Sequence, residues 1–418
     1  MNSLPRVFLI FVLTGAAAST TFAQTPPLPA AVTIDDVLRL FNDRSPRTAA
    51  DRASIDVTAA DRITARTYPN PDVSYGAAHL VSGLSTGAVT QHQIVVDEPL
   101  LLFKQRRARL DAADLNVNAE QARVARTLSD RRLQVRQAFA TLLSRQQQVT
   151  VIQESVADLQ RVEGVVRGRA EAGEQSDYDV ARIETETERV RVEVMNAEAD
   201  VIDAAGELAT LLGFPGWSPR ATGDLAPDAS VPTDIDALWS TAQQRRPSLV
   251  AIRQQQAAAR GGLFLARRER LPVPAFSAGT QMTQNVTGAS TFFGFSMPLP
   301  FSDRGQGAIA KANAQIRAQD LAFEAELAEA HADVERATTV LAKRRAALDE
   351  LETRVVQRVP SLRRMSEDAY REGGAGILEL LDAMRSVKDI QIAHVQQLES
   401  SKLAEAVVVS VAGLDNQP

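Results

Sequence analysis

Residues Lys104 to Glu163 contain neither proline nor glycine over 60 positions and lie within the longest stretch of this chain that lacks a helix-breaking residue. Such a stretch can form one continuous helix of roughly 90 Å, at 1.5 Å per residue, which few globular cores could accommodate. Its apolar residues recur every seven positions, at Leu128, Val135, Leu142, Val149 and Val156. This spacing predicts a left-handed coiled-coil seam rather than the buried stripe of an ordinary globular helix.

A second ladder with the same spacing lies nearer the C-terminus, at Leu327, Val334, Leu341, Leu348, Val355 and Leu362. It contains Pro360, which lacks a backbone N–H and collides with the preceding turn, so we expect a kink there. Beyond the two ladders, turns at Gly173 and Gly373 should reverse each long helix into a shorter one. The shorter helices should end near Gly213 and Gly413, because glycine readily forms a left-handed C-cap.

Landmarks in the two halves recur at a nearly constant offset, which indicates a tandem duplication. The matching landmarks are Ile34, Asp35 and Pro46 with Ile235, Asp236 and Pro247; Pro69 and Pro71 with Pro272 and Pro274; and Pro99, Gly173 and Gly213 with Pro298, Gly373 and Gly413. Prolines and glycines crowd residues 214–233, which predicts a linker. We therefore expect a first repeat at 33–213 and a second at 234–414, with short tails at 24–32 and 415–418.

The first 23 residues have the pattern of a secretory signal peptide. The apolar run from Val7 to Leu13 is too short to span a bilayer, and Thr21-Phe22-Ala23 fits a cleavage site. A membrane anchor or a disordered tail is the alternative. Beyond Ala23 no run approaches 18 consecutive apolar residues, so a mature chain that crosses a membrane must do so with β-strands.

Composition and motifs exclude several function classes. The net charge of −6 provides no polycationic surface for nucleic acid. Cysteine is absent, which excludes disulfides, thiol catalysis and a lipid anchor on cysteine. The four histidines lack a paired-ligand spacing, although His79 and His92 on opposite strands of one predicted hairpin leave a metal ion conceivable. No catalytic or nucleotide motif is present, so we predict no enzyme activity, no cofactor and no metal site.

Short β-prone segments precede each long helix, at about 72–80 and 91–98 and at about 275–283 and 290–298. Each is about as long as a tilted membrane strand. Alternation places Phe276, Ala278, Thr280 and Met282 on one face of their strand, and Phe293 and Phe295 on one face of the next. This bias of aromatic residues toward the strands favours contact with lipid, while a soluble two-hairpin sheet is the alternative.

Four strands cannot close into a barrel, and an open sheet in lipid would leave unpaired edges. Two copies would give eight strands with a filled interior, whereas three copies would give twelve strands and a lumen. A homotrimer is therefore the smallest assembly that forms a pore, and its helices would extend roughly 90–100 Å from the membrane. The competing class is a periplasmic coiled-coil structural or adaptor protein without a pore.

The chain resembles the TolC-like outer-membrane efflux channels of Gram-negative bacteria, from about Thr33 to Leu414. The residues that carry the resemblance are Tyr68-Pro69-Asn70-Pro71, Pro298-Leu299-Pro300-Phe301-Ser302-Asp303-Arg304-Gly305-Gln306-Gly307, Tyr370-Arg371-Glu372-Gly373 and Glu379-Leu380-Leu381-Asp382-Ala383. The second of these motifs is most similar to the branch that serves cobalt-zinc-cadmium exporters.

The resemblance implies a mainly α fold with a small β part. Long coiled-coil hairpins would form a periplasmic tunnel, and four strands per chain would enter a trimeric twelve-stranded barrel in the outer membrane. It implies a passive exit duct in a tripartite efflux system. Many members are lipid-anchored through a cysteine after the signal peptide, but this chain has no cysteine, so we expect no lipid anchor here. A periplasmic adaptor and an inner-membrane pump of the RND type would be its partners, and heavy-metal cations are one substrate class that this branch suggests.

The resemblance also implies roles for residues near the two helical turns. Glu379 and Asp382 match an acidic pair at the periplasmic aperture, with Asp177, Asp179 and Tyr370 as further aperture residues. The alternative for the acidic pair is a solvated helix face. The turns would dock the adaptor through Gly173, Glu174, Gly373 and Gly374. One departure is Ala375, which stands where some members carry an arginine that holds the aperture closed.

Overall fold

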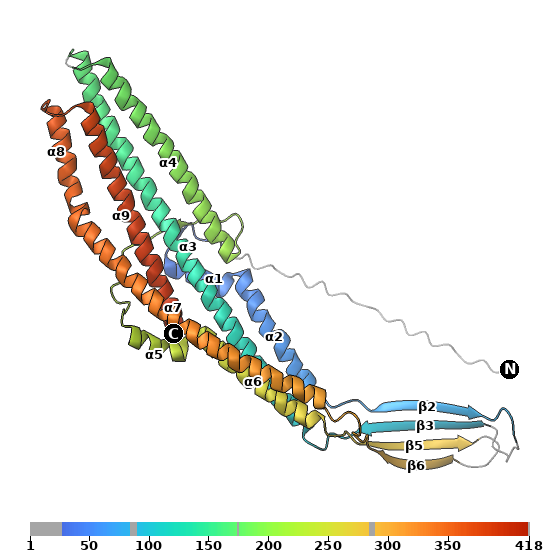
Figure 1. The fold of residues 1–418 in the computed structure, drawn as a ribbon. Coiled ribbons are helices and arrows are strands. Elements are labelled where there is room, and N and C mark those ends of the chain that lie inside the picture. The colour runs from blue at the N-terminus through green and yellow to red at the C-terminus, as the bar shows by residue number, and fades with distance from the viewer. Residues whose placement is uncertain (1–26, 84–89, 174, 284–288, 417–418) are drawn as a thin grey trace, which may run out of the picture.

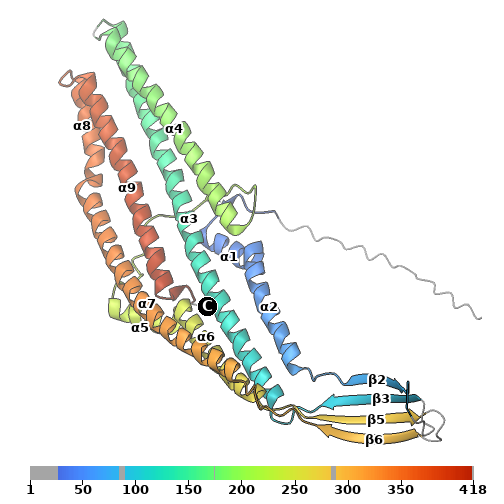
Figure 2. The ribbon, with the colours of Figure 1, turned by 45° about the vertical axis from the view of Figure 1, so that its right-hand side comes forward.

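The computed structural model describes residues 27–83, 90–173, 175–283 and 289–416. The predicted signal peptide at 1–23 lies outside these described residues. So do residues 24–26 of the tail that follows it, Glu174, and residues 417 and 418 of the final tail. The molecule is elongated, with paired long helices at one end and a small sheet at the other (Figures 1 and 2). Among the described residues, no helix combines the length and the apolar character needed to cross a bilayer.

The two halves of the chain repeat one order of elements, which is two short helices, a strand hairpin, a long helix and a returning helix. The first half contains α1 (Ile34–Arg44), α2 (Pro46–Arg66), β2 (Asp72–His79), β3 (Thr90–Pro99), α3 (Gln105–Glu171) and α4 (Asp177–Leu212). The second contains α5 (Ile235–Arg245), α6 (Pro247–Glu269), β5 (Ala275–Thr283), β6 (Ala289–Ser296), α7 (Gln306–Arg354), α8 (Val359–Arg371) and α9 (Ile377–Val411).

The long helices differ between the halves. The single helix α3 runs for 67 residues, and its heptad residues Leu128, Val135 and Leu142 are buried. The second long helix is interrupted, because α7 ends at Arg354 and a 3₁₀ turn at Val356–Arg358 precedes α8. The predicted kink is confirmed. Pro360 lies in the first turn of α8, where backbone N–H groups have no partner within the helix, so the missing N–H of proline costs no hydrogen bond.

The segment 214–233 between the halves is packed against the helices. Its strand β4 (Arg220–Ala221) pairs in parallel with β1 (Ala31–Val32), and Leu225 is fully buried. The Trp217 indole N–H donates a hydrogen bond to the carbonyl oxygen of Pro29. This segment and α1 lie against α3 at mid-height, and we call them together the girdle (Figure 1).

The helices form an open wall. At its centre α3 contacts α2 and α4 on one side and α6 and α9 on the other, while α7 packs on α6 and α9 and α8 packs on α9. One edge of the wall is therefore α2 with α4, and the other is α7 with α8. The sheet has the antiparallel order β2-β3-β5-β6 and is likewise open at both edges. In the chain β2 follows α2 and β6 precedes α7. Each open edge of the sheet therefore lies below an open edge of the helical wall, β2 with the α2 edge and β6 with the α7 edge (Figure 1).

The sheet has one apolar and one polar face. The strand register places Val73, Tyr75, Ile94, Val96, Phe276, Met282, Phe293 and Phe295 on the first face. All eight side chains are at least 40% exposed, up to 74% for Phe293. The second face carries mainly small and polar residues, including Ser74, Gln91, Gln93, Asp97, Ser277, Gln281 and Ser290. A sheet of this kind leaves its apolar face without a partner inside one chain.

Candidate functional site

The two helical turns lie together at the end of the molecule farthest from the strands (Figure 1). We call this end the tip; it comprises the last turns of α3 and α8, the first turns of α4 and α9, and the turns between them. Gly173 and Gly373 have φ angles of +78° and +76°, a left-handed conformation that glycine adopts without a steric cost. A Cβ atom at either glycine would meet nothing within 4 Å, so both turns are open to solvent.

Three of the predicted acidic residues begin the helices that leave these turns. Ser176 caps α4, and Asp179 Oδ2 accepts hydrogen bonds from the Ser176 hydroxyl and the Gln175 amide, both at 2.8 Å. In α9 the Glu379 carboxylate accepts a hydrogen bond from the Gly376 N–H, which is the reciprocal half of a capping box. Asp179 and Glu379 therefore stabilise helix starts as well as adding negative charge there.

Glu379 and Asp382 share an exposed face of α9, opposite the residues that face the tip core. Asp177 is also exposed, at the start of α4. Asp382 attracts Arg385, one turn further along α9, so the acidic pair lies beside a basic group. Within the described part of one chain, no hydrogen bond or ion pair joins the acids of α4 to those of α9.

The tip core joins the two repeats. It is formed by Leu159, Val162 and Val166 of α3, Ile183 and Val190 of α4, Tyr370 of α8, and Ile377, Leu380, Leu381 and Met384 of α9. These residues come from both hairpins, so apolar burial holds the first repeat against the second.

Tyr370 belongs to this core and is only 4% exposed. The Arg169 guanidinium lies 5.7 Å from the centre of its ring and donates a hydrogen bond of 3.1 Å to its carbonyl oxygen. The Tyr370 hydroxyl has no hydrogen-bond partner among the described residues, and burial raises its pKa. Tyr370 therefore packs between the hairpins of one chain, covered by an arginine from the other repeat.

Ion pairs continue the contact between the repeats below the tip core. Glu186 of α4 is 5% exposed, and its carboxylate accepts hydrogen bonds from Arg385 of α9 and from Arg189 on its own helix. Its partner Arg385, supported by Arg189, holds the pKa of Glu186 at about 2, although burial acts in the opposite direction. One heptad further along α4, Glu193 accepts a hydrogen bond of 2.6 Å from the buried Lys388 of α9.

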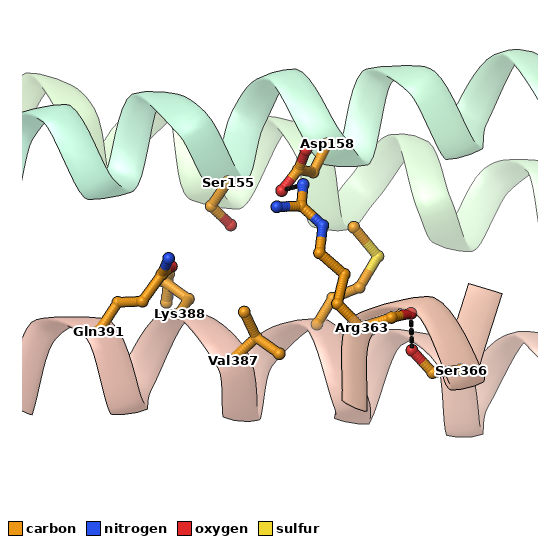
Figure 3. Close-up of a pocket in the computed structure, with 8 residues that line it drawn as sticks. Ser155, Asp158, Arg363, Ser366, Val387, Lys388 and Gln391 are labelled. Carbon is orange, nitrogen blue, oxygen red and sulfur yellow. Dashed lines mark hydrogen bonds and ion pairs between the residues drawn. The ribbon is translucent and has the colours of Figure 1, made fainter. Parts of the chain in front are cut away.

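A further ion pair connects α8 to α3. Figure 3 shows Arg363 reaching from α8 to Asp158 on α3, with Ser155 and Lys388 nearby. The cavity among these side chains has a volume of about 10 Å³, room for no more than one water molecule. The junction is thus closely packed and is not a ligand site.

The histidines are engaged singly. The Tyr75 hydroxyl lies 2.8 Å from Nδ1 of His92, and the Thr90 hydroxyl lies at the same distance from Nδ1 of His79. In the described part of the chain, no three or more histidine, aspartate or glutamate side chains are grouped so that they could hold a metal ion.

The inter-repeat ion pairs were not predicted from the sequence. A signal for one of them was present, since Glu186 occupies a core-facing position between Ile183 and Val190, where an apolar residue is the norm. Its partner could not be read from α4 alone, because Arg385 lies 199 residues away.

Comparisons with known proteins agree with this architecture. The model of the outer membrane efflux protein family matches residues 37–214 and 238–414. The cobalt-zinc-cadmium resistance protein CzcC of Cupriavidus metallidurans is 23% identical over 411 residues, which cover 96% of each chain. The pyoverdine export outer membrane protein OpmQ of Pseudomonas putida is 26% identical over 291 residues, 66% of this chain and 60% of OpmQ.

Among solved structures, the transmembrane channel protein CusC matches with a TM-score of 0.73 at 15% sequence identity, covering 91% of this chain and 92% of CusC. At that identity the likeness shows the fold alone, which is TolC-like. The family model, in contrast, spans both repeats and therefore most of the sequence. The chain belongs to the outer membrane efflux protein family.

Proposed function

We propose that three copies of this chain form the outer-membrane exit channel of a tripartite efflux system. The observation that carries the proposal is that the sheet and the helical wall are open at the same two edges, with an apolar sheet face left exposed. A ring of copies joins β6 of one to β2 of the next and thereby satisfies every strand edge. Three copies give twelve strands around a lumen, whose wall is the polar face of the sheet.

The free edges of the helical wall carry coiled-coil seams that suit this ring. On α4 the exposed residues at alternating spacings of three and four are Tyr178, Ala181, Thr185, Glu188, Val192, Met195, Ala199, Ile202 and Gly206. On α7 they are Ala314, Ala318, Leu321, Ala325, Ala328, Ala332, Glu335, Thr339, Ala342 and Ala346. Ile202 is 71% exposed and Leu321 is 67% exposed. The α7 seam consists mainly of alanines, so the α4 seam of the neighbouring copy, which has larger residues, can approach it closely.

Cysteine crosslinking tests this ring in a chain that has no native cysteine. Ile202→Cys is combined in turn with Thr339→Cys, Ala342→Cys and Ala346→Cys, which lie at about the same height along the wall, and the purified protein is oxidised. We expect at least one combination to give a ladder that stops at three chains. The matched control combines the same α7 cysteines with Asp200→Cys, which is exposed on α4 but lies off the seam. A ladder that stops at two chains, or equal crosslinking from Asp200→Cys, contradicts the ring.

The tip is proposed as both the aperture and the docking surface for a periplasmic adaptor. The turns at Gly173, Glu174, Gly373 and Gly374 would be the membrane-distal ends of all hairpins in the trimer. Glu379, Asp382, Asp177 and Asp179 would then line the opening, with Tyr370 supporting it from the tip core. Energy for transport would come from an inner-membrane pump, for which we propose the RND type. The similarity to the cobalt-zinc-cadmium resistance protein CzcC supports heavy-metal cations as cargo.

Bilayer recordings test the role of the acidic pair. Rings of Glu379 and Asp382 should attract cations and repel anions, because unit charges a few Å apart couple by about 4 kcal/mol at an effective dielectric near 20. The variant Glu379→Gln with Asp382→Asn keeps the capping box, since glutamine can accept from the Gly376 N–H. We expect it to lose most of the cation preference, whereas the control Asp203→Asn with Glu207→Gln, exposed at the girdle end of α4, should not. An unchanged reversal potential would place the pair on a solvated outer face.

A further inference from the structure

Four connections join the helices to the sheet, and all of them lie at the same end of the sheet (Figures 1 and 2). They are residues 67–71, 100–104, 270–274 and 297–305. With the adjoining helical turns and strand ends they form what we call the collar, which comprises residues 63–72, 97–108, 266–275 and 296–309. In a channel whose sheet lies in a membrane, the collar is at the level of the lipid headgroups on the side of the helices.

Charged residues of the sheet region are confined to this end. The sequence contains no aspartate, glutamate, lysine or arginine between Asp72 and Asp97, or between Arg270 and Asp303. The strands and both hairpin turns therefore carry no formal charge while their two histidines are neutral. The collar, in contrast, has eight basic and five acidic residues in a chain whose net charge is −6.

Five of the eight basic side chains of the collar are exposed and have no acidic partner. Among the described residues no ion pair is formed by Arg66, Lys104, Arg267, Arg270 or Arg304. Arg107 is also exposed but pairs with Asp111 on its own helix. Unpaired cations at a surface raise the local concentration of anions, so the five are free to attract an anionic partner.

Two of the five acidic residues of the collar are held by neighbouring groups. Glu269 pairs with Arg109 at 3.0 Å. Asp303 accepts a hydrogen bond of 2.9 Å from the Gly305 N–H through Oδ1. Both carboxylates are therefore occupied, and neither contacts one of the five cations.

The other three acidic residues lie at the strand ends. Asp72 and Asp97 are opposite each other on the polar face of the sheet, where Asp97 also accepts a hydrogen bond from the Ser277 hydroxyl. Of these three only Glu98 is on the apolar face, by the strand register. One carboxylate on the apolar side cannot neutralise five cations.

Exposed apolar side chains lie among the cations. Within the collar they are Tyr68, Leu102, Phe103, Met297, Leu299 and Phe301. The Arg106 guanidinium lies 4.6 Å from the centre of the Tyr68 ring, and that of Arg268 lies 5.2 Å from the ring of Phe264. Aromatic rings beside basic groups are typical of the boundary between membrane and water. Exposed apolar groups are unfavourable in a water-filled lumen, which favours contact of this mixed surface with lipid.

We propose that the collar binds the headgroups of anionic phospholipids in the leaflet on the side of the helices. Its cations pair with phosphate oxygens, and its apolar side chains lie against the adjoining part of the acyl chains. The inference rests on the proposed function, because the sheet must lie in a membrane. Since the turn end of the sheet carries no charge, the preference for anionic lipid is confined to one leaflet and fixes the height of the channel in the bilayer.

Fluorescence quenching measures the lipid preference at each end of the sheet. The full-length protein is reconstituted in liposomes with a bimane label on one introduced cysteine, either Val73→Cys near the collar or His79→Cys beside the turns. Both positions are exposed on one face of β2, about 20 Å apart at 3.3 Å per residue. The quencher is phosphatidylglycerol or phosphatidylcholine with a nitroxide near the headgroup end of one acyl chain, diluted into unlabelled phosphatidylcholine. We expect phosphatidylglycerol to be preferred about fivefold or more in the Val73→Cys protein and less than about twofold in the His79→Cys protein.

Two sets of substitutions show whether the collar causes the preference. The collar variant, in the Val73→Cys protein, combines Lys104→Gln, Arg267→Gln, Arg270→Gln and Arg304→Gln. It should reduce the preference to less than about twofold. The matched control removes the same charges from exposed positions of the α7–α8 arm, away from the sheet, by Lys343→Gln, Arg344→Gln, Arg358→Gln and Arg364→Gln. It should keep the preference.

The outcomes separate this inference from the proposed function. Equal quenching by the two lipids in the Val73→Cys protein, or a preference that survives in the collar variant, would overturn the inference and leave the channel intact. An equal loss of preference in the control would also overturn it. Absence of quenching by either lipid would show that the sheet does not face lipid, and would overturn the proposed function together with the inference.

Discussion

Acidification should loosen the contact between α4 and α9 through one residue, Glu186. The pKa of this carboxyl is about 2 in the folded chain, against an ordinary value of 4.5. Because the folded pKa is the lower one, the stabilisation is fully present above pH 4.5 and is lost as the pH falls from 4.5 toward 2. A shift of this size corresponds to roughly 3 kcal/mol, of which about 2 kcal/mol is lost by pH 3.

Hydrogen exchange measured by mass spectrometry, expressed as protection factors, detects this loss locally. Peptides from α4 and α9 that contain Glu186 and Arg385 should lose about thirtyfold in protection between pH 7 and pH 3, the equivalent of about 2 kcal/mol. In Glu186→Gln the same peptides should be less protected at pH 7 and should change little with pH.

The matched control is Glu188→Gln, two residues away. Glu188 is 65% exposed and pairs with Arg191 on its own helix, so its loss should matter little. Two results would refute the reasoning. One is a wild-type protection factor that does not change between pH 7 and pH 3, and the other is an equal loss of pH dependence in the Glu188→Gln control.

Three further predictions concern single positions. Tyr370→Phe removes a buried hydroxyl that has no partner among the described residues, so it should leave the midpoint of thermal unfolding unchanged or raised. Tyr370→Ala should destabilise the tip by about 3–5 kcal/mol. A lower midpoint for the phenylalanine variant would reveal a partner for the hydroxyl. Gly373→Trp should abolish efflux in cells while the protein still purifies as a trimer, and Gly373→Asn should retain activity because asparagine tolerates a positive φ. Phe293→Lys, on the apolar sheet face, should cost about 2–4 kcal/mol per chain in membrane-inserted protein, whereas Gln281→Lys on the polar face should not, as judged by resistance of the oligomer to heating in detergent.

Local sequence rules were sufficient for the elements that depend on one segment. The proline- and glycine-free stretch after Lys104 predicted α3, and Pro360 predicted the interruption of the second long helix. Alternation predicted the shared face of Phe276 and Ala278, which the strand register confirms by pairing them with Phe295 and Phe293. Each of these features follows from steric and periodic constraints that act within a few residues.

The tip required information that no single segment contains. Tyr370 carried a motif, yet its burial beneath Arg169 depends on how two hairpins meet. The choice of Arg385 as partner for Glu186 is equally non-local, because a long flexible side chain can pair with any carboxylate that the fold brings within reach. The role of Glu379 in capping α9 was within reach of the sequence, since a glutamate three residues after a cap is a known pattern.

The interruption at 355–358 gives the two repeats different mechanical properties. A load applied to the tip along α3 passes through 67 residues of unbroken helix, about 100 Å, to the strands, so α3 acts as a rigid strut. The same load on α8 meets a 3₁₀ turn before it reaches α7 and bends the chain at that joint. One subunit therefore combines an unbroken arm with a jointed arm of almost equal length. We expect a displacement at the tip to bend the second repeat at its joint before it moves the sheet.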